Sequence, residues 1–488
     1  MSGWDDADTA RTYQQFDSRH GRYRLANRAL ARHAELRPGL TVLDLAAGSG
    51  GTVAALLPEL GEVGRVDALE PARAMADLGR KRHAAEGRLR WLDSMDAAAA
   101  SYERVTCGAA IWQWDDLAAL FAELAQRLAP GGALVFNIPA AYLGRPDGPG
   151  GGADPYLIQV IQLLAADTPG VVASSAVATA RPNETRWSVT RIARALRAAG
   201  LVPRRWQQRQ KLTQAAWCDW LKVPPVSAGL WPQATAAERA ERIDAAAAGL
   251  DRDSWRPELW LGWTAWRPAF PCAQLGDDTR LVGRPAELRA RGRARGVLRL
   301  SNILPRRLVA DLRHEILRAA AALGLVDARG RWCGGCAGAA HEVRGWVELQ
   351  AAVAQTSAFA AIAGNSLLSG LVEMLHGGSV RGAMGSVCRI APPEHCVPAT
   401  PAHRDSDYLH GPENTWIAWL PLTPCGVPEG VLAVAPGSHL SEMPPQWSAA
   451  ELQPGDLLLV HAHTLHRACP NLYAARCRLS VDLRFAAE

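Results

Sequence analysis

The feature that most constrains this chain is a change in its apolar pattern near residue 296. Between residues 39 and 138, short apolar runs alternate with Ala- and Leu-rich stretches of helical length. After residue 296, one helical stretch is followed by short β-type runs separated by Gly and Pro. The first pattern predicts a parallel sheet with helices on both faces, and the second predicts antiparallel β structure. A chain of 488 residues is long enough for two or three such domains.

The two patterns can be divided into elements. In the first part we expect strands at 41–45, 65–69, 89–92, 109–111, 133–137 and 260–266, and helices at 52–57, 72–84, 118–128, 188–199 and 234–249. In the second part we expect a helix at 305–323 and strands at 416–422, 431–435, 456–461 and 479–485. Residues 269–295 are loose and Arg-rich, which indicates a solvated linker. The expected domains are therefore 1–268 and 296–488.

Bulk properties narrow the range of partners. The formal net charge is only +5, so no nucleic-acid partner is expected. The acidic start lacks the apolar segment of a signal peptide, and no uninterrupted apolar run reaches about 18 residues, so we expect no membrane association. The ten cysteines are scattered rather than spaced as a disulfide framework. These features are typical of a cytoplasmic protein that acts on a small molecule, and they do not indicate an oligomeric state.

A glycine-containing loop lies between the first expected strand and helix. The segment VLDLAAGSGG spans residues 42–51, and its small residues at Ala46, Gly48 and Gly50 allow the backbone to approach a ligand closely. Glu70 ends the next expected strand, where an acidic side chain would bind ribose hydroxyls. The spacing GxGxxG of dinucleotide folds is absent. The pattern therefore predicts a site for another nucleoside cofactor.

Several segments together resemble the class I S-adenosylmethionine-dependent methyltransferases, which have a Rossmann-like α/β fold. The matching segments are VLDLAAGSG (42–50), ALEPARAM (68–75), LDSMD (92–96), AAIWQWDD (109–116) and LAPGGALVF (128–136). The resemblance covers roughly residues 1–268. Its fourth-strand segment, Ile-Trp-Gln-Trp, differs from the Asn-Pro-Pro-Tyr of DNA amino-methyltransferases. A small-molecule acceptor is therefore expected.

The resemblance implies roles for individual residues of the first domain. Asp44 would orient the glycine loop, and Gly48 and Gly50 would pass beside the methionine moiety of S-adenosylmethionine. Glu70 would hold the ribose, and Asp93 with Ser94 would lie by the adenine. Ala46 stands where the family's loop usually has its first glycine. Four N-terminal side chains could form a lid over this site, although residues of these types more often simply pack helices together: Tyr13, Phe16, His20 and Tyr23.

Metal-ligand chemistry is indicated near the C-terminus. His403 and Asp405 form an HxD pair, whose side chains would share one face of a strand. His466 follows much later, and two histidines with one carboxylate on a β scaffold form the facial triad of non-haem Fe(II) oxygenases. His461 and His463 compete with His466 as the third ligand. Arg478 and Ser480 form another i,i+2 pair, which suits a ligand carboxylate.

These segments resemble the phytanoyl-CoA dioxygenase family. The matches are TPAHRDSDYLHGPENTWIAWLPL (400–422), EGVLAVAPGSHL (429–440), PGDLLLVHAHTLHRACPN (454–471) and RLSVDLRF (478–485). The resemblance implies a mainly β double-stranded β-helix (jelly-roll) fold. It also implies that His403, Asp405 and His466 bind Fe(II), and that Arg478 with Ser480 binds 2-oxoglutarate. His466 is favoured because it precedes the Arg-Ala-Cys-Pro-Asn turn as the family's ligand does.

Two functional hypotheses follow from these resemblances. In the first, the chain is a bifunctional tailoring enzyme that methylates and hydroxylates a small molecule in secondary-metabolite biosynthesis. In the second, only one domain is catalytic, and the other is a binding or recruitment module. Halogenation is not expected in either case, because halogenases of this type carry a small residue at the position that Asp405 occupies here.

Overall fold

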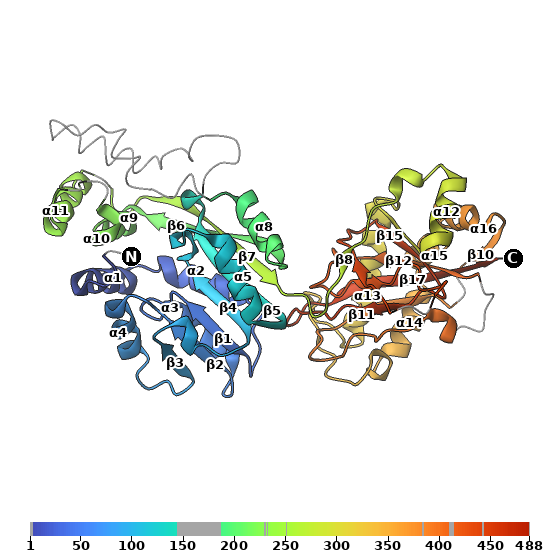
Figure 1. The fold of residues 1–488 in the computed structure, drawn as a ribbon, viewed down its shortest axis with the longest axis horizontal. Coiled ribbons are helices and arrows are strands. Elements are labelled where there is room, and N and C mark those ends of the chain that lie inside the picture. Colours follow the sequence, from blue (N-terminus) through green and yellow to red (C-terminus); the bar gives the residue numbers. More distant parts are fainter. Residues whose placement is uncertain are drawn as a thin grey trace. The chain divides into compact units, whose positions relative to one another are not determined.

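The computed structural model of the chain describes residues 3–143, 187–228, 231, 233–249, 251–382, 385–408, 414–441 and 444–487. Contacts divide the chain into two compact units, Met1–Arg267 and Pro268–Glu488. Figure 1 shows the first unit in blue to green and the second in yellow to red.

In its described residues, the first unit is built on one seven-stranded sheet with the strand order β3-β2-β1-β4-β5-β7-β6. The strands are β1 (Thr41–Leu45), β2 (Arg65–Leu69), β3 (Leu89–Leu92), β4 (Tyr102–Gly108), β5 (Leu128–Pro139), β6 (Val202–Thr213) and β7 (Trp255–Trp266). The α-helices are α1 (Ala7–Arg19), α2 (Arg22–His33), α3 (Gly51–Leu56), α4 (Arg73–Arg82), α5 (Leu117–Arg127), α8 (Val189–Ala198), α9 (Gln214–Leu221), α10 (Pro224–Ser227) and α11 (Ala236–Ala247). Short 3-10 turns are η1 (Leu57–Leu60), η2 (Met95–Ala97), η3 (Ile111–Gln113) and η4 (Ala140–Tyr142).

Along the sheet, neighbouring strands pair in parallel in the order β3, β2, β1, β4 and β5. Strand β7 pairs antiparallel with both β5 and β6. The Rossmann-like architecture expected from the sequence is therefore confirmed. Helix α5 illustrates its local cause. Asp116 accepts hydrogen bonds from the N–H groups of Ala118 and Ala119 and so caps the helix. The apolar residues then recur with helical spacing on one buried face: Leu117, Leu120, Phe121 and Leu124.

The fourth strand differs from its predicted position. We expected a strand at 109–111, but β4 ends at Gly108, and Ile111–Gln113 forms a 3-10 turn. The strand was hidden by Arg104, a charged residue that is nevertheless buried. Its guanidinium donates hydrogen bonds to the carbonyls of Ala34, Glu103 and Glu35, so its burial leaves no donor nitrogen unpaired.

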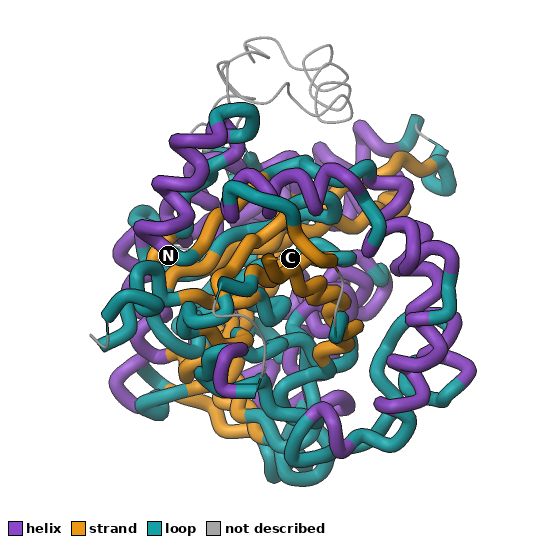
Figure 2. The backbone as a smooth tube through the Cα atoms, turned by 90° about the vertical axis from the view of Figure 1, so that its right-hand side faces the viewer, coloured by secondary structure: helices purple, strands orange, loops and turns teal. Residues whose placement is uncertain are grey.

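Two sheets are found in the described part of the second unit. One has the order β10-β17-β12-β15-β9 with β11 also on β17, and the other has the order β16-β13-β14-β8. The strands are β8 (Ala273–Gln274), β9 (Val297–Leu300), β10 (Val380–Gly382), β11 (Val387–Ala391), β12 (Trp416–Pro421), β13 (Leu432–Val434), β14 (Ser448–Ala449), β15 (Leu457–His461), β16 (His466–Ala468) and β17 (Arg478–Ala487). The helices are α12 (Pro285–Arg295), α13 (Arg306–Ala322), α14 (Trp346–Ala354), α15 (Ser357–Ala363) and α16 (Ser366–His376), with 3-10 turns η5 (Thr279–Leu281), η6 (Ala340–Glu342) and η7 (Asp405–Asp407). Figure 2 colours the elements of both units by type.

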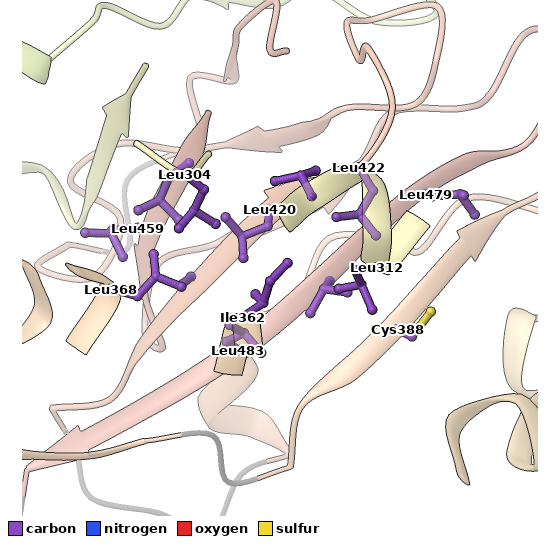
Figure 3. Packing of buried hydrophobic residues seen from close by; sticks show 14 of the residues in the cluster. Leu304, Leu312, Ile362, Leu368, Cys388, Leu420, Leu422, Leu459, Leu479 and Leu483 are labelled. Carbon is purple, nitrogen blue, oxygen red and sulfur yellow. The ribbon is translucent and has the colours of Figure 1, made fainter. Parts of the chain in front are cut away.

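Helices cover the outer face of the larger sheet. In Figure 3, Leu312 of α13 and Ile362 of α15 lie beside Leu420 of β12 and Leu483 of β17. All four side chains are fully buried in one apolar cluster. Burial of a leucine-sized side chain contributes about 1.5–3 kcal/mol. This cluster fixes the strands whose opposite face carries the polar site described below.

The expected linker at 269–295 is folded instead. Strand β8 pairs with β14, and helix α12 buries Leu288 in the core of the second unit. The Arg-rich composition concealed these contacts because the arginines cover the outside of the helix, and Arg291 and Arg295 reach Asp278. The segment therefore belongs to the second unit.

One stretch, Ser357–His376, has the length and the mean hydropathy of 1.5 that a membrane-crossing helix would need. It consists of two helices, because α15 ends at Ala363 and Asn365 caps the start of α16. Leu368, Leu371 and Val372 of α16 are buried in the apolar cluster of the second unit. The stretch therefore serves as part of a protein core in this structure.

Candidate functional site

The HxD pair and His466 meet at one point of the second unit. Possible ligand atoms of His403, Asp405 and His466 all lie within 4.8 Å of one another. Backbone pairing causes this convergence, because His403 and His466 form an isolated antiparallel bridge. The expectation that the HxD pair lies on a strand is wrong, because His403 forms only an isolated bridge and Asp405 begins the 3-10 turn η7. Oδ2 of Asp405 lies 3.9 Å from Nε2 of His466. The geometry thus joins residues that are 63 positions apart in the sequence.

The two histidines present the same ring nitrogen to this point. Nδ1 of His403 lies 2.8 Å from the carbonyl oxygen of Pro401, and Nδ1 of His466 lies 2.9 Å from that of Thr464. A carbonyl can only accept a hydrogen bond, so each Nδ1 carries the proton. Each Nε2 lone pair is then available to a metal. Burial lowers the pKa of His466, which also favours its neutral, metal-binding form.

His461 and His463, the alternatives to His466, lie outside the group formed by His403, Asp405 and His466. The ring of His461 packs edge-on against Trp416 at 5.2 Å and lies 5.5 Å from the ring of His463. Burial, and then the neighbouring His439, lowers the pKa of His461 to about 4. Neither His461 nor His463 belongs to the three-residue cluster that could hold a metal ion among the described residues. The geometry therefore favours His466 as the third member.

Arg478 and Ser480 lie side by side on β17. Arg478 is buried, and its Nη1 donates a hydrogen bond to Oγ of Ser480, while its Nε donates to the carbonyl of Gly430 at 3.1 Å. The guanidinium also lies 5.4 Å from the ring of Trp419. Burial lowers the pKa of Arg478. A carboxylate that reached this group would form a charge-assisted hydrogen bond in a desolvated setting.

One pocket joins the two groups of residues. Its lining includes His403, Asp405 and His466 at one part and Arg478 at another. Apolar side chains of Ile417, Trp419, Leu432 and Val460 complete much of the wall. Apolar walls with a few polar groups are typical of sites for small ligands.

Two further charged residues line this cavity and were not predicted. Nε of Arg389, from β11, donates a hydrogen bond of 2.6 Å to Oδ2 of Asp482. On the same strand face as Asp482, Nη2 of Arg484 lies 3.7 Å from Oδ1 of Asp405. A signal for Asp482 and Arg484 was present, because polar positions 478, 480, 482 and 484 alternate with the buried apolar residues between them.

The glycine loop of the first unit has the backbone that its sequence requires. Gly48 and Gly50 have φ angles of 57° and 75°, and Ala46 has a φ angle of 55°. The left-handed region suits glycine, so Ala46 holds a strained conformation there. A side chain at Gly50 would collide with the ring of His83, which lies 2.7 Å from the position of an added Cβ.

Two acidic residues are associated with this loop: Asp44 precedes it in β1, and Glu70 is hydrogen-bonded to it. Asp44 is fully buried in β1, and its Oδ1 accepts a hydrogen bond of 2.7 Å from Thr106. Burial raises the pKa of Asp44 to about 7. The two carboxylate oxygens of Glu70 accept hydrogen bonds of 2.8 Å from the N–H groups of Gly48 and Ala72. Burial raises the pKa of Glu70. Glu70 therefore fixes the loop and leaves further lone pairs for a ligand hydroxyl.

Asp93 and Ser94 follow β3 on the surface. The side chain of Asp93 is 94% exposed and forms an ion pair with Arg80 at 3.3 Å. Ser94 is also exposed. The structure places both residues after β3, which pairs with β2, but it gives neither a contact with the glycine loop.

Comparisons with known proteins match a separate family to each part of the chain. The profile of the family "Phytanoyl-CoA dioxygenase (PhyH)" matches residues 292–476, and that of the family "Methyltransferase domain" matches residues 42–132. A 1-deoxypentalenic acid 11-beta-hydroxylase from Streptomyces arenae is 32% identical over a region that covers 17% of this chain and 40% of that protein. The chain thus spans less than half the length of this curated relative.

Two solved structures are similar to different parts of the chain. The non-heme alpha-ketoglutarate-dependent epimerase SnoN from nogalamycin biosynthesis is 22% identical, with a TM-score of 0.34, and the match covers 42% of this chain and 84% of the epimerase. A methyltransferase structure from Bacillus halodurans is 15% identical, with a TM-score of 0.33, and the match covers 49% of this chain and 97% of that protein.

Proposed function

Because this chain joins a methyltransferase domain to a phytanoyl-CoA dioxygenase domain, we propose that it is a bifunctional enzyme. Its first domain would methylate a small molecule with S-adenosylmethionine, and its second domain would hydroxylate a small molecule with Fe(II) and 2-oxoglutarate. The observation that carries the second activity is the convergence of His403, Asp405 and His466 in one cavity with Arg478. Secondary metabolism is the proposed context, because the matched relative hydroxylates 1-deoxypentalenic acid.

The donor set of the second domain fits Fe(II). Two neutral imidazole nitrogens and one carboxylate leave open coordination positions for a co-substrate and O₂. His403 and His466 each keep the ring proton on Nδ1 through a backbone carbonyl, so both can bind a metal through Nε2. Bound Fe(II), with 2-oxoglutarate and O₂, supplies the oxidising chemistry that inserts oxygen into a C–H bond and releases succinate and CO₂. Asp405 keeps a carboxylate where a halogenase would need space for chloride.

The remaining residues of the cavity bind and orient. Arg478 and Ser480 would hold the distal carboxylate of 2-oxoglutarate, since both lie buried on one strand face. Arg484 lies beside Oδ1 of Asp405, and Oδ2 of that carboxylate faces His466. Arg484 would therefore orient Asp405 toward the metal. Trp419 and Leu432 would exclude water from the reacting carbon.

The first domain needs to position two molecules rather than to activate them. The methyl group of S-adenosylmethionine is already bonded to a positive sulfur, so alignment supplies most of the rate. Glu70 would bind the ribose while it fixes Gly48. Gly48 and Gly50 would allow the methionine moiety to lie against the backbone. Asp93 and Ser94 would lie at the adenine end.

Two binding measurements on the purified full chain test this proposal. Calorimetry with S-adenosylmethionine should show one site in the first domain. Under anaerobic conditions, Fe(II) and 2-oxoglutarate together should produce the visible charge-transfer absorption of a metal-bound 2-oxo acid. Binding of only one set of cofactors would favour the alternative that the other domain recruits substrate. Binding of neither set would refute both activities.

A further inference from the structure

The first unit contains a group of aromatic side chains that the glycine loop does not explain. We call Trp4, Tyr13, Phe16, Tyr23, Trp220 and Trp260 the aromatic cluster. Helices α1, α2 and α9 and strand β7 contribute to it. Ring centroids of Phe16 and Trp220 are 5.3 Å apart, and those of Tyr23 and Trp220 are 5.4 Å apart. Tyr23 also packs edge-on against Trp260 at 5.8 Å.

A buried arginine lies within the aromatic cluster. Arg22 is 5% exposed, and its Cζ lies 5.2 Å from the ring centroid of Trp220 and 5.4 Å from that of Tyr23. Its Nε and Nη2 donate hydrogen bonds to Glu258. Glu258 in turn accepts hydrogen bonds from Gln210 and Trp260. This network fixes the direction of the guanidinium.

One nitrogen of this guanidinium has no hydrogen-bond partner in the part of the chain that the structure describes. Among the residues that the structure describes, no acceptor lies within hydrogen-bond distance of Nη1 of Arg22. Arg104, which is equally buried and also lies over a tryptophan ring, differs in this respect. All three of its nitrogens donate to backbone carbonyls. A buried donor without an acceptor is costly, so Nη1 of Arg22 is a donor available to a ligand oxygen.

The aromatic cluster adjoins the end of the strands that carry the cofactor loop. Ala109 directly follows β4, the neighbour of β1 in the sheet, and it packs against the aromatic cluster. Its N–H donates to Asn137, whose amide donates to the carbonyl of Ala26 in α2. Ala109 also has a φ angle of 58°, a strained conformation of the kind found at functional sites. Methyl donor and aromatic cluster would therefore share one edge of the sheet.

We propose that the aromatic cluster and Arg22 form the methyl-acceptor site, and that the acceptor is an aromatic molecule bearing a carbonyl or phenolic oxygen. The oxygen would accept a hydrogen bond from Nη1 of Arg22, and the ring would pack against Tyr23 and Trp220. Glu258 neutralises Arg22, so an uncharged or singly charged acceptor fits better than a polyanion. This inference rests on the proposed methyltransferase activity.

The proposed reaction transfers one methyl group from S-adenosylmethionine to the acceptor. A lone pair of the acceptor's nucleophilic atom forms a bond to the methyl carbon, and the carbon–sulfur bond breaks with its electron pair passing to sulfur. The products are the methylated acceptor and S-adenosylhomocysteine. The proton of the acceptor leaves to water.

Binding of two probes to the full chain, saturated with S-adenosylhomocysteine, tests the inference. 2-Hydroxy-1,4-naphthoquinone is aromatic and bears carbonyl and hydroxyl oxygens, whereas methyl β-glucoside has oxygens but no aromatic ring. Calorimetry should show binding of the naphthoquinone at least about tenfold tighter than that of the glucoside, a difference of about 1.4 kcal/mol. Similar affinities for the two probes would overturn the proposed acceptor class.

Three variants locate the binding. The double variant Arg22→Gln/Glu258→Gln removes both charges together, so neither charge is left buried without a partner. It and Trp220→Leu should each bind the naphthoquinone at least about tenfold more weakly, whereas Trp255→Leu, at an exposed tryptophan of the same unit, should not. Unchanged binding in both test variants would overturn the location. Loss of S-adenosylmethionine binding in both would assign these residues to the cofactor instead. Failure of the wild type to bind S-adenosylmethionine would refute the proposed activity itself.

Discussion

His403 and His466 exchange backbone hydrogen bonds. The N–H of His403 donates to the carbonyl of His466 at 2.9 Å, and the N–H of His466 donates to that of His403 at 3.0 Å. Their ring centroids are 4.3 Å apart. The two rings are therefore held together by the main chain, whether or not a metal lies between them.

Replacement of either histidine should remove the metal and leave the fold. His403→Ala and His466→Ala should each weaken Fe(II) binding by more than about 100-fold and abolish succinate formation, since each takes away a ligand. His461→Ala is the control, because its ring lies against Trp416 rather than in the triad. Succinate formation that survives both ligand replacements would contradict this assignment.

Asp405→Ala should stop productive turnover, because it removes the carboxylate that faces His466. We expect succinate to disappear or to form without product. Mass spectrometry of wild-type reactions in chloride buffer should show a gain of oxygen. A chlorinated product would contradict the reading of Asp405.

Arg478→Gln should act on the co-substrate rather than on the metal. The lost charge-assisted hydrogen bond should weaken 2-oxoglutarate binding by about 2–3 kcal/mol. Fe(II) affinity should stay unchanged, and the exposed Arg381→Gln provides the control. An unaltered KM for 2-oxoglutarate would count against a role for Arg478.

Glu70→Ala should weaken S-adenosylmethionine binding by about 1–3 kcal/mol, because it removes a ligand contact and the acceptor that fixes Gly48. Oxygenation should be unaffected. The exposed Glu123→Ala should leave calorimetric affinity as in the wild type. Equal affinity in the Glu70 variant would show that this acid does not support the loop.

Asp44 should make the stability of the first domain depend on pH. Burial raises its pKa to about 7 from the usual 3.8, so its neutral form is favoured in the folded state. The associated stability is fully present below pH 4 and is lost as the pH rises toward 7. One pKa unit corresponds to about 1.4 kcal/mol. The stability of Asp44→Asn relative to the wild type should therefore increase by a few kcal/mol from pH 4 to pH 7 in denaturant titrations. A stability difference between the two proteins that stays constant from pH 4 to pH 7 would contradict this prediction.

Much of the fold was predictable because apolar spacing and secondary structure agree along most of both domains. Strands β1, β2 and β3 lie where the pattern placed them. The apolar pattern did not predict strands whose polar residues are buried or lie at the edge of the sheet. Arg104 interrupts the apolar run of β4, and β6 carries Arg, Gln and Lys along most of its length because it ends the sheet. Composition likewise concealed α12, whose arginines surround one buried leucine.

The candidate site was predictable to the extent that it follows local spacing. The pairs 403/405 and 478/480 stand two residues apart, and each pair lies in the cavity or beside it. Arg389 was not predicted because it reaches Asp482 only through the pairing of β11 with β17. The aromatic cluster likewise joins helices at the N-terminus to residues more than 190 positions later. Such contacts depend on topology, which no single window of sequence contains.

Strand β17 places Arg478, Ser480, Asp482 and Arg484 on one face and Leu479, Val481, Leu483 and Phe485 on the other. An insertion of one residue near its start would exchange the two faces over the whole strand. Charges would then enter the leucine layer shown in Figure 3, and hydrocarbon would fill the cavity. Length changes in β17 should therefore destroy solubility and activity in the same clones, so that a screen of random insertions should recover active variants only with this strand at its original length.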